Sequence, residues 1–117
     1  MILSLALPRM GEITRPGIVR RVIARPGDAL RPGVTLLEVR VDLDETNARD
    51  CPATIFYRLI ATERAYLRTL SVAPGDVLEV AAPIGVATTS LEEAFDGPPV
   101  RSLRTTSISI QVDPLST

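Results

Sequence analysis

Two segments of this chain repeat each other at a distance of 48 residues. Residues 24–30 read ARPGDAL, and residues 72–78 read VAPGDVL. In each copy proline presets φ for a turn, glycine tolerates a positive φ, and aspartate accepts hydrogen bonds from nearby backbone. Apolar residues flank both turns, and the alignment continues without gaps to residues 39 and 87. The repeat predicts an all-β fold built from two similar halves.

Apolar segments separated by turns predict five strands in the body of the domain, at residues 2–7, 18–24, 34–41, 53–60 and 65–72. The apolar residues 77–87 close the second half. The 10 prolines and 7 glycines favour turns over long helices. Aromatic residues make up only 3% of the chain and tryptophan is absent, so we expect a core of Val, Leu, Ile and Ala.

A change of composition after residue 88 divides the chain into two parts. Residues 1–88 form the predicted β domain, and residues 89–117 form a C-terminal tail that begins with linker-like composition. Residues 91–95 predict one helical turn with Ser90 as its N-cap. Residues 107–112 alternate between polar and apolar, which predicts an edge strand that joins the body or pairs with another chain.

The charge and the hydrophobic pattern exclude several classes of partner. The net charge is −1, so no basic excess is present for nucleic-acid binding. No apolar run reaches the ~20 residues of a membrane span, and residues 1–7 lack the positive start of a signal peptide. Cys51 is the single cysteine and forms no intrachain disulfide, which favours the cytoplasm.

The chain lacks the residues that most enzymes use for proton transfer. It contains no histidine, and all 13 of its basic residues are arginine. Only carboxylates, tyrosines and one thiol remain as acids and bases, and no catalytic motif joins them. Cys51 has no histidine to act as its base and lies in an acidic segment, which disfavours the thiolate. We therefore expect no enzyme activity and interpret Cys51 as buried or incidental.

The residues around the two turns resemble lipoyl and biotinyl carrier domains. Residues 7–12 (LPRMGE), 17–19, 27–28 and 33–39 are similar to the opening half of such a domain, and residues 61–87 are similar to its closing half. The resemblance covers roughly residues 3–88. It implies a barrel-sandwich hybrid of two four-stranded sheets, with half-repeats related by a pseudo-twofold axis and an extended central hairpin.

The resemblance also places the lysine that carriers use for acylation, at the tip of the central hairpin. Counting forward from Glu38 gives Leu43, and counting back from Gly75 gives Thr54, because this hairpin is longer than in the carriers. Neither residue has a primary amine, and an arginine cannot substitute because its guanidinium stays protonated. The resemblance thus implies the scaffold without the acyl cofactor, and we expect no other cofactor.

The hairpin, residues 42–52, is polar, acidic and longer than most connections. One interpretation of the hairpin is a neutral surface insertion, since long loops cost little entropy. The other is contact with a partner, because carriers present this position to partner enzymes. The candidate partner-binding residues are Asp42, Leu43, Asp44, Glu45, Asn47, Arg49 and Asp50. Their acidic members weakly resemble a calcium loop without its glycine and closing glutamate, so we favour a solvated hairpin with no metal.

Three arginines near the first turn have two interpretations. Arg20, Arg21 and Arg25 form a docking patch for an acidic partner, or they occupy the solvent-facing positions of a half-buried sheet. We favour the second interpretation.

Our functional hypothesis is a non-acylated lipoyl/biotinyl-like module that acts by protein–protein interaction. Its hairpin would face a partner enzyme or complex that depends on acyl carriers, and self-association through an edge strand stays open. One alternative is a structural subunit or fragment of a larger enzyme or transport assembly. A third is an enzyme activity completed by residues of a partner.

Overall fold

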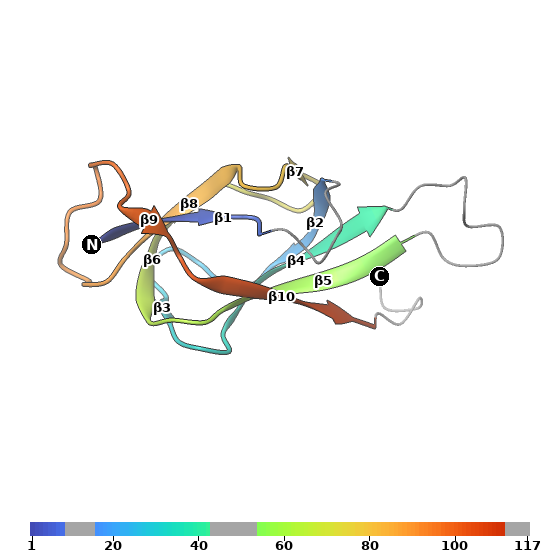
Figure 1. The fold of residues 1–117 in the computed structure, drawn as a ribbon, viewed down its shortest axis with the longest axis horizontal. Coiled ribbons are helices and arrows are strands. Elements are labelled where there is room, and N and C mark those ends of the chain that lie inside the picture. Colours follow the sequence, from blue (N-terminus) through green and yellow to red (C-terminus); the bar gives the residue numbers. More distant parts are fainter. Residues whose placement is uncertain (9–15, 43–53, 112–117) are drawn as a thin grey trace.

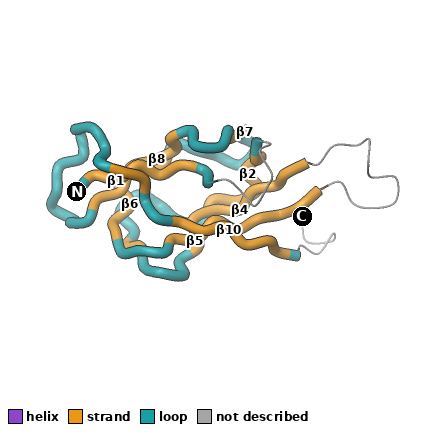
Figure 2. The backbone as a smooth tube through the Cα atoms, in the orientation of Figure 1, coloured by secondary structure: helices purple, strands orange, loops and turns teal. Residues whose placement is uncertain are grey.

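The computed structural model describes residues 1–8, 16–42 and 54–111. These residues form strands, turns and loops, and none of them lies in a helix (Figure 2). None of them therefore offers a helix that could cross a bilayer. The strands are β1 (Ile2–Ala6), β2 (Gly17–Val22), β3 (Ala29–Leu30), β4 (Thr35–Asp42), β5 (Thr54–Ala61), β6 (Ala65–Leu70), β7 (Val77–Leu78), β8 (Pro83–Thr88), β9 (Arg101–Ser102) and β10 (Thr105–Ile110). The all-β prediction is confirmed.

The strands form two sheets of five (Figure 1). The first sheet has the order β3-β6-β8-β1-β9, and the second has the order β10-β5-β4-β2-β7. The prediction of four strands per sheet differs from this count because the tail adds one edge strand to each sheet. β9 lies parallel to β1, and β10 lies antiparallel to β5 along its whole length.

The 48-residue spacing of the sequence repeat is kept in the strands. β6 begins and ends 48 residues after β2, and β7 does so relative to β3. The burial of successive residues is also the same in β2 and β6. The order β3-β6-β8 in the first sheet matches β7-β2-β4 in the second. β3 of the first half thus pairs with β6 of the second half, and β7 of the second half pairs with β2 of the first half.

The two Pro-Gly-Asp turns are held by reciprocal backbone hydrogen bonds between the halves. In each turn the glycine amide donates to a strand of the other half, and the amide of the same strand residue donates back to the turn's aspartate carbonyl. The four bonds run from Gly27 to Leu67 (2.7 Å), from Leu67 to Asp28 (2.9 Å), from Gly75 to Val19 (2.8 Å) and from Val19 to Asp76 (2.8 Å). Both aspartates also cap their own turn, because their carboxylates accept the amides of Arg25 and Ala73.

A second turn in each half has a left-handed residue at an equivalent position. Gly33 has φ 97°, and Ala81, 48 residues later, has φ 70°. The amide of Ala81 donates to the carbonyl of Leu7 at 2.9 Å. This turn divides residues 77–87, which close the second half, into β7 and β8. No glycine or proline marks residues 79–82, which is why the sequence pattern missed the turn.

Aliphatic side chains fill the space between the two sheets. The fully buried apolar residues of the described part are all Leu, Val, Ile or Ala, as predicted. Leu103 of the tail belongs to this core, and its amide donates to the carbonyl of Ser4 at 2.8 Å. The predicted helical turn at residues 91–95 is absent, since the hydrogen bond from Glu93 to Ser90 closes only a turn.

Replacing Gly75 by valine tests the requirement for a left-handed turn. Gly75 has φ 95°, and a β-carbon added there would meet no atom within 4 Å. The cost is therefore backbone strain rather than a clash, and a β-branched residue tolerates positive φ poorly. We expect Gly75→Val to lower the free energy of unfolding by more than about 1 kcal/mol, measured by urea denaturation.

Gly97→Ala is the matched control for this substitution. Gly97 has no positive φ, and its added β-carbon would make an ordinary contact of 3.5 Å with Ile2. We expect a change of less than about 1 kcal/mol. Equal effects of the two substitutions would contradict the role assigned to the turn.

Candidate functional site

The structure locates two of the residues that the sequence singled out at the central hairpin. Asp42 ends β4 and Thr54 begins β5, and the two lie opposite each other. The hydroxyl of Thr54 donates to Asp42 Oδ1 at 3.2 Å, and Arg40 Nε lies 3.2 Å from the same oxygen. The other candidates, Leu43, Asp44, Glu45, Asn47, Arg49 and Asp50, lie outside the described residues, as does Cys51.

The described residues next to the hairpin belong to the outer face of the second sheet. In β4, Leu37, Val39 and Val41 point into the core, so Glu38 and Arg40 point to the opposite face. The strand register then aligns a set of side chains with them on that face. These are Phe56 and Arg58 of β5 and Ile108 and Ile110 of β10.

Glu38 is the centre of this face. It is only 1% exposed although it points away from the core, because three arginine side chains surround it. Its Oε1 accepts from Arg20 at 2.7 Å, and its Oε2 accepts from Arg21 at 3.3 Å and from Arg58 Nε at 3.2 Å. We call Glu38 and these three arginines the Glu38 cluster.

A β-bulge explains how two consecutive arginines reach one carboxylate. The pairing of β2 with β4 shifts between Val19 and Arg21, so Arg20 and Arg21 are placed against Glu38. Successive residues of a regular strand would point to opposite faces, and a bulge removes this alternation locally. The sequence interpretation placed Arg20 and Arg21 at solvent-facing positions. Both lie on the outer face, where they also pair with Glu38, and Arg21 remains 59% exposed. Arg25 lies outside the cluster, in the turn before β3.

Apolar side chains adjoin the Glu38 cluster. The Arg20 guanidinium lies 5.8 Å from the centre of the Phe56 ring, within the range of a cation–π contact. Ile108 on the edge strand is 43% exposed. Arginine and aromatic residues are the types enriched at protein interfaces. The face therefore combines fixed positive charge with accessible apolar area.

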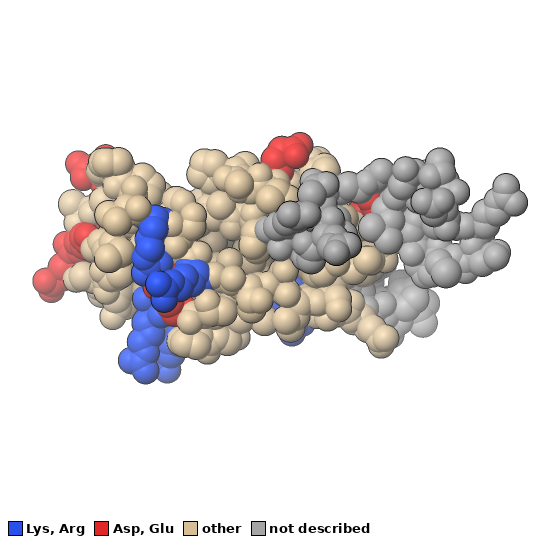
Figure 3. Space-filling model, in the orientation of Figure 1, with Lys and Arg blue, Asp and Glu red and all other residues tan. Residues whose placement is uncertain are grey.

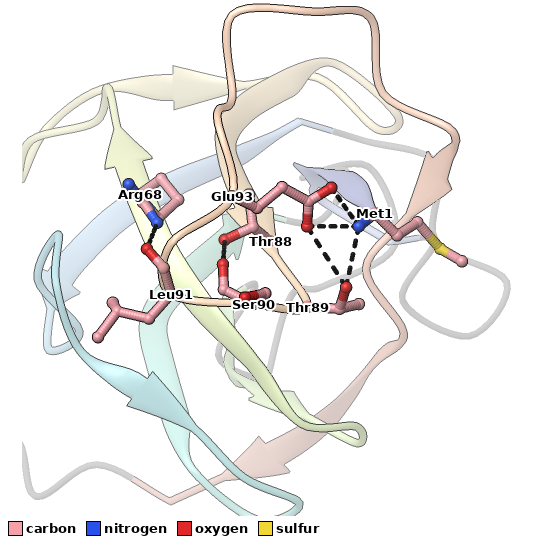
Figure 4. Close-up of polar contacts among 7 residues, drawn as sticks. All are labelled: Met1, Arg68, Thr88, Thr89, Ser90, Leu91 and Glu93. Atoms are coloured by element: carbon pink, nitrogen blue, oxygen red, sulfur yellow. Dashed lines mark hydrogen bonds and ion pairs between the residues drawn. The ribbon is translucent and has the colours of Figure 1, made fainter.

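The start of the tail, before β10, contacts the first sheet, as Figure 4 shows. Arg68 of β6 donates to the carbonyl of Leu91, and its guanidinium lies 4.5 Å from the centre of the Phe95 ring. The amino group of Met1 contacts the carboxylate of Glu93 and donates to Thr89 Oγ1 at 2.9 Å. In the described part of the chain the two sheets thus differ, because the contacts of the Glu38 cluster come only from its own sheet.

A bidentate ion pair fastens the tail to the turn between β5 and β6. Arg101 donates to both oxygens of Glu63 at 2.7 Å, and the amide of Arg104 donates to Oε2 at 2.6 Å. The Arg101 hydrogen bonds are the main cause that lowers the pKa of Glu63 to about 2. Arginine side chains gather on this part of the surface in Figure 3, between β9 and β3. We call these contacts of Glu63 with Arg101 and Arg104 the Glu63 clamp, and they position the start of β10.

The described polar side chains of the outer face bond mainly to one another. Both oxygens of Glu38 accept hydrogen bonds from arginines. The described residues also contain no group of three or more acidic, thiol or imidazole side chains close enough to hold a metal. One surface depression of about 460 Å³ contains Arg31, Arg64 and Tyr66 but no acidic residue. The outer face of the second sheet consists of ion-paired arginines and partly exposed apolar side chains.

The sequence reasoning missed Glu38, Phe56 and Arg58 as members of one site. Part of the signal was present, because Arg58 is the single charged residue of the apolar strand β5 and Glu38 interrupts the apolar run of β4. Strand pairing brings these residues opposite each other, and a residue pattern within one strand does not specify which residues of the next strand it faces.

Removing the charge of Glu38 tests the cluster. Glu38→Gln leaves three guanidinium groups close together without their shared carboxylate. We expect the free energy of unfolding to fall by about 2 kcal/mol, less than for a fully buried pair because the arginines keep part of their hydration. Urea denaturation measures the change. The control is Glu79→Gln, an exposed glutamate, for which we expect a change within about 0.5 kcal/mol. Equal effects of both variants would contradict the cluster.

Glu63 makes stability dependent on pH. Its pKa in the folded protein, about 2, lies below the ordinary value of 4.5, so the ion pair contributes fully above pH 4.5 and is lost as the pH falls towards 2. We expect Glu63→Gln to be less stable than the wild type by about 1 kcal/mol at pH 7. This difference should shrink between pH 4.5 and pH 2 in urea denaturation. If the difference in stability between the wild type and Glu63→Gln stayed constant over this pH range, the Glu63 clamp would be excluded.

Comparison with protein-family models, with curated proteins and with solved structures gives no match for this chain. Any functional interpretation therefore rests on the residues and their geometry.

Proposed function

We propose that this chain is a lipoyl/biotinyl-like barrel-sandwich hybrid that carries no acyl group and acts by docking to a protein partner. The partner would be an enzyme or complex that depends on acyl carriers, in the cytoplasm. The docking surface is the outer face of the second sheet, from β2 to β10, together with the adjacent end of the sheet where the central hairpin begins.

The exchange of short strands between the halves supports the scaffold. β3 pairs with β6 and β7 pairs with β2, so each sheet contains strands of both halves. This pairing is the one expected if two half-repeats are related by a pseudo-twofold axis. Four body strands per sheet agree with the family's fold once β9 and β10, which come from the tail, are set apart.

The base of the hairpin supports a role without acylation. Thr54, one of the two positions aligned with the carrier lysine, begins β5 and donates its hydroxyl to Asp42. It is therefore a residue of the sheet ladder rather than of a hairpin tip. The other position, Leu43, has no nucleophilic atom. Because the whole chain lacks lysine, no side-chain amine is present to form the amide of a carrier.

The observation that carries the docking proposal is the composition and order of the outer face. The Glu38 cluster holds Arg20 and Arg58 in fixed positions by hydrogen bonds, while Arg21 and Arg40 are 59% and 44% exposed. Ordered arginines beside Phe56 and the isoleucines of β10 lose little conformational entropy on binding. A partner with acidic and apolar side chains would be complementary to this face.

A capture experiment with purified protein and host lysate tests the proposal. The variant Arg21→Ala/Arg40→Ala removes the two exposed arginines of the face. The matched control, Arg25→Ala/Arg31→Ala, removes two exposed arginines outside it, so both variants lose the same charge. We expect a partner, identified by mass spectrometry, that the wild type and the control retain and the first variant loses by roughly tenfold. If both variants lose the partner, the loss reflects net charge rather than this face. If both variants retain the partner, the face is not part of the interface.

A further inference from the structure

The long edge of the second sheet differs from the other three edges of the described sheets. β3, β7 and β9 are edge strands of two residues each. β10 has six residues and pairs with β5 without a register shift. Proteins usually protect edge strands by making them short, bulged, charged or interrupted by proline, because free backbone groups pair with other strands. Three edges of this protein are short, and β10 is not.

The sequence of β10 lacks the other protective features. Its residues are Thr, Thr, Ser, Ile, Ser and Ile, with no charge, glycine or proline. All six are serine or β-branched residues, and β-branched types favour strands. Ile108, near its centre, is 43% exposed on the outer face. Among the described residues, no strand pairs with the outer edge of β10, and an apolar side chain is exposed beside it.

We propose that β10 pairs with β10 of a second copy of this chain, antiparallel and about a twofold axis at Ile108. The two second sheets would then join into one continuous sheet. This self-association is separate from the docking function proposed above, because it uses the backbone edge of β10, although it shares Ile108 with the docking face.

A second copy of this chain is the expected partner because the edge of β10 is complementary to itself. An antiparallel pairing centred on Ile108 keeps the core-facing and outer side chains of both copies on their own sides. Ile108 then lies against Ile108 of the second copy, and Ser107 lies opposite Ser109. Thr106 lies opposite Ile110. No charged side chain of either strand meets its copy, so the pairing carries no repulsion, and it covers the exposed isoleucine.

The interface is small, which sets the strength of the association. A single six-residue pairing buries less than the roughly 1,200 Å² of a standard stable interface. We therefore expect a weak, concentration-dependent dimer rather than an obligate one. Sedimentation velocity over a wide range of protein concentration measures it.

Two lysine substitutions test the position of the axis. Ile108→Lys places two like charges against each other and should weaken the dimer by roughly tenfold or more. Thr106→Lys adds the same charge to the same face, but the two copies of residue 106 would lie about 14 Å apart, and the dimer should weaken less than about threefold. Unchanged melting temperatures show that both variants fold. A monomeric wild type, or equal weakening by both variants, overturns the proposal.

Disulfide cross-linking gives an independent readout. In a Cys51→Ser background the only cysteine is the one introduced. Ile108→Cys would place two Cα atoms about 5 Å apart, within the range of a disulfide, whereas Thr106→Cys would place them about 14 Å apart. We expect mild oxidation to link the first variant and not the second. Linking of neither, or of both to the same extent, would overturn the register.

Discussion

The fold depends on hydrogen bonds that each half of the chain makes only with the other. The glycine amides of both Pro-Gly-Asp turns donate to a strand that lies 40 or more residues away in sequence. The hydrogen bonds of each turn are thus made with the other half. The two-residue strand that follows each turn also pairs with a strand of the other half. The partners of the two turns, Leu67 and Val19, are buried, so neither half can satisfy the backbone groups of these two residues alone, and unpaired buried groups are costly. The repeat therefore specifies a single cooperative unit rather than two small domains.

This arrangement also determines where an interaction surface can lie. The space between the sheets is filled by aliphatic side chains, so the interior offers little room for a ligand. Residues of the tail contact β1 and β6 of the first sheet. The second sheet instead presents Glu38 and its arginines, which a bulge in β2 brings to one face. A buried carboxylate with three arginine partners is typical of a structural element that orders the surrounding cations.

Much of the body could be predicted from residue patterns, and the site could not. The turns at Gly27 and Gly75 follow from chemistry within seven residues, so their positions and the strands that precede them, β2 and β6, were predicted. β3 was missed because two residues carry no periodicity, and the turn at Ala81 was missed because alanine rarely adopts positive φ. The Glu38 cluster depends on strand register and on a bulge. Those are tertiary properties that a local pattern does not contain.

Native-state hydrogen exchange at the amides of Gly27 and Gly75 tests the interlocking of the two halves most directly. If each turn is held by the other half, both amides should exchange through the same opening. Their free energies of opening should then be equal to each other and to that of the Leu67 amide, which lies between the turn and the core. If the amide of one turn exchanges through a local opening of lower free energy while the amide of the other turn stays protected, the two halves do not depend on each other. That result would contradict the interlocking of the halves.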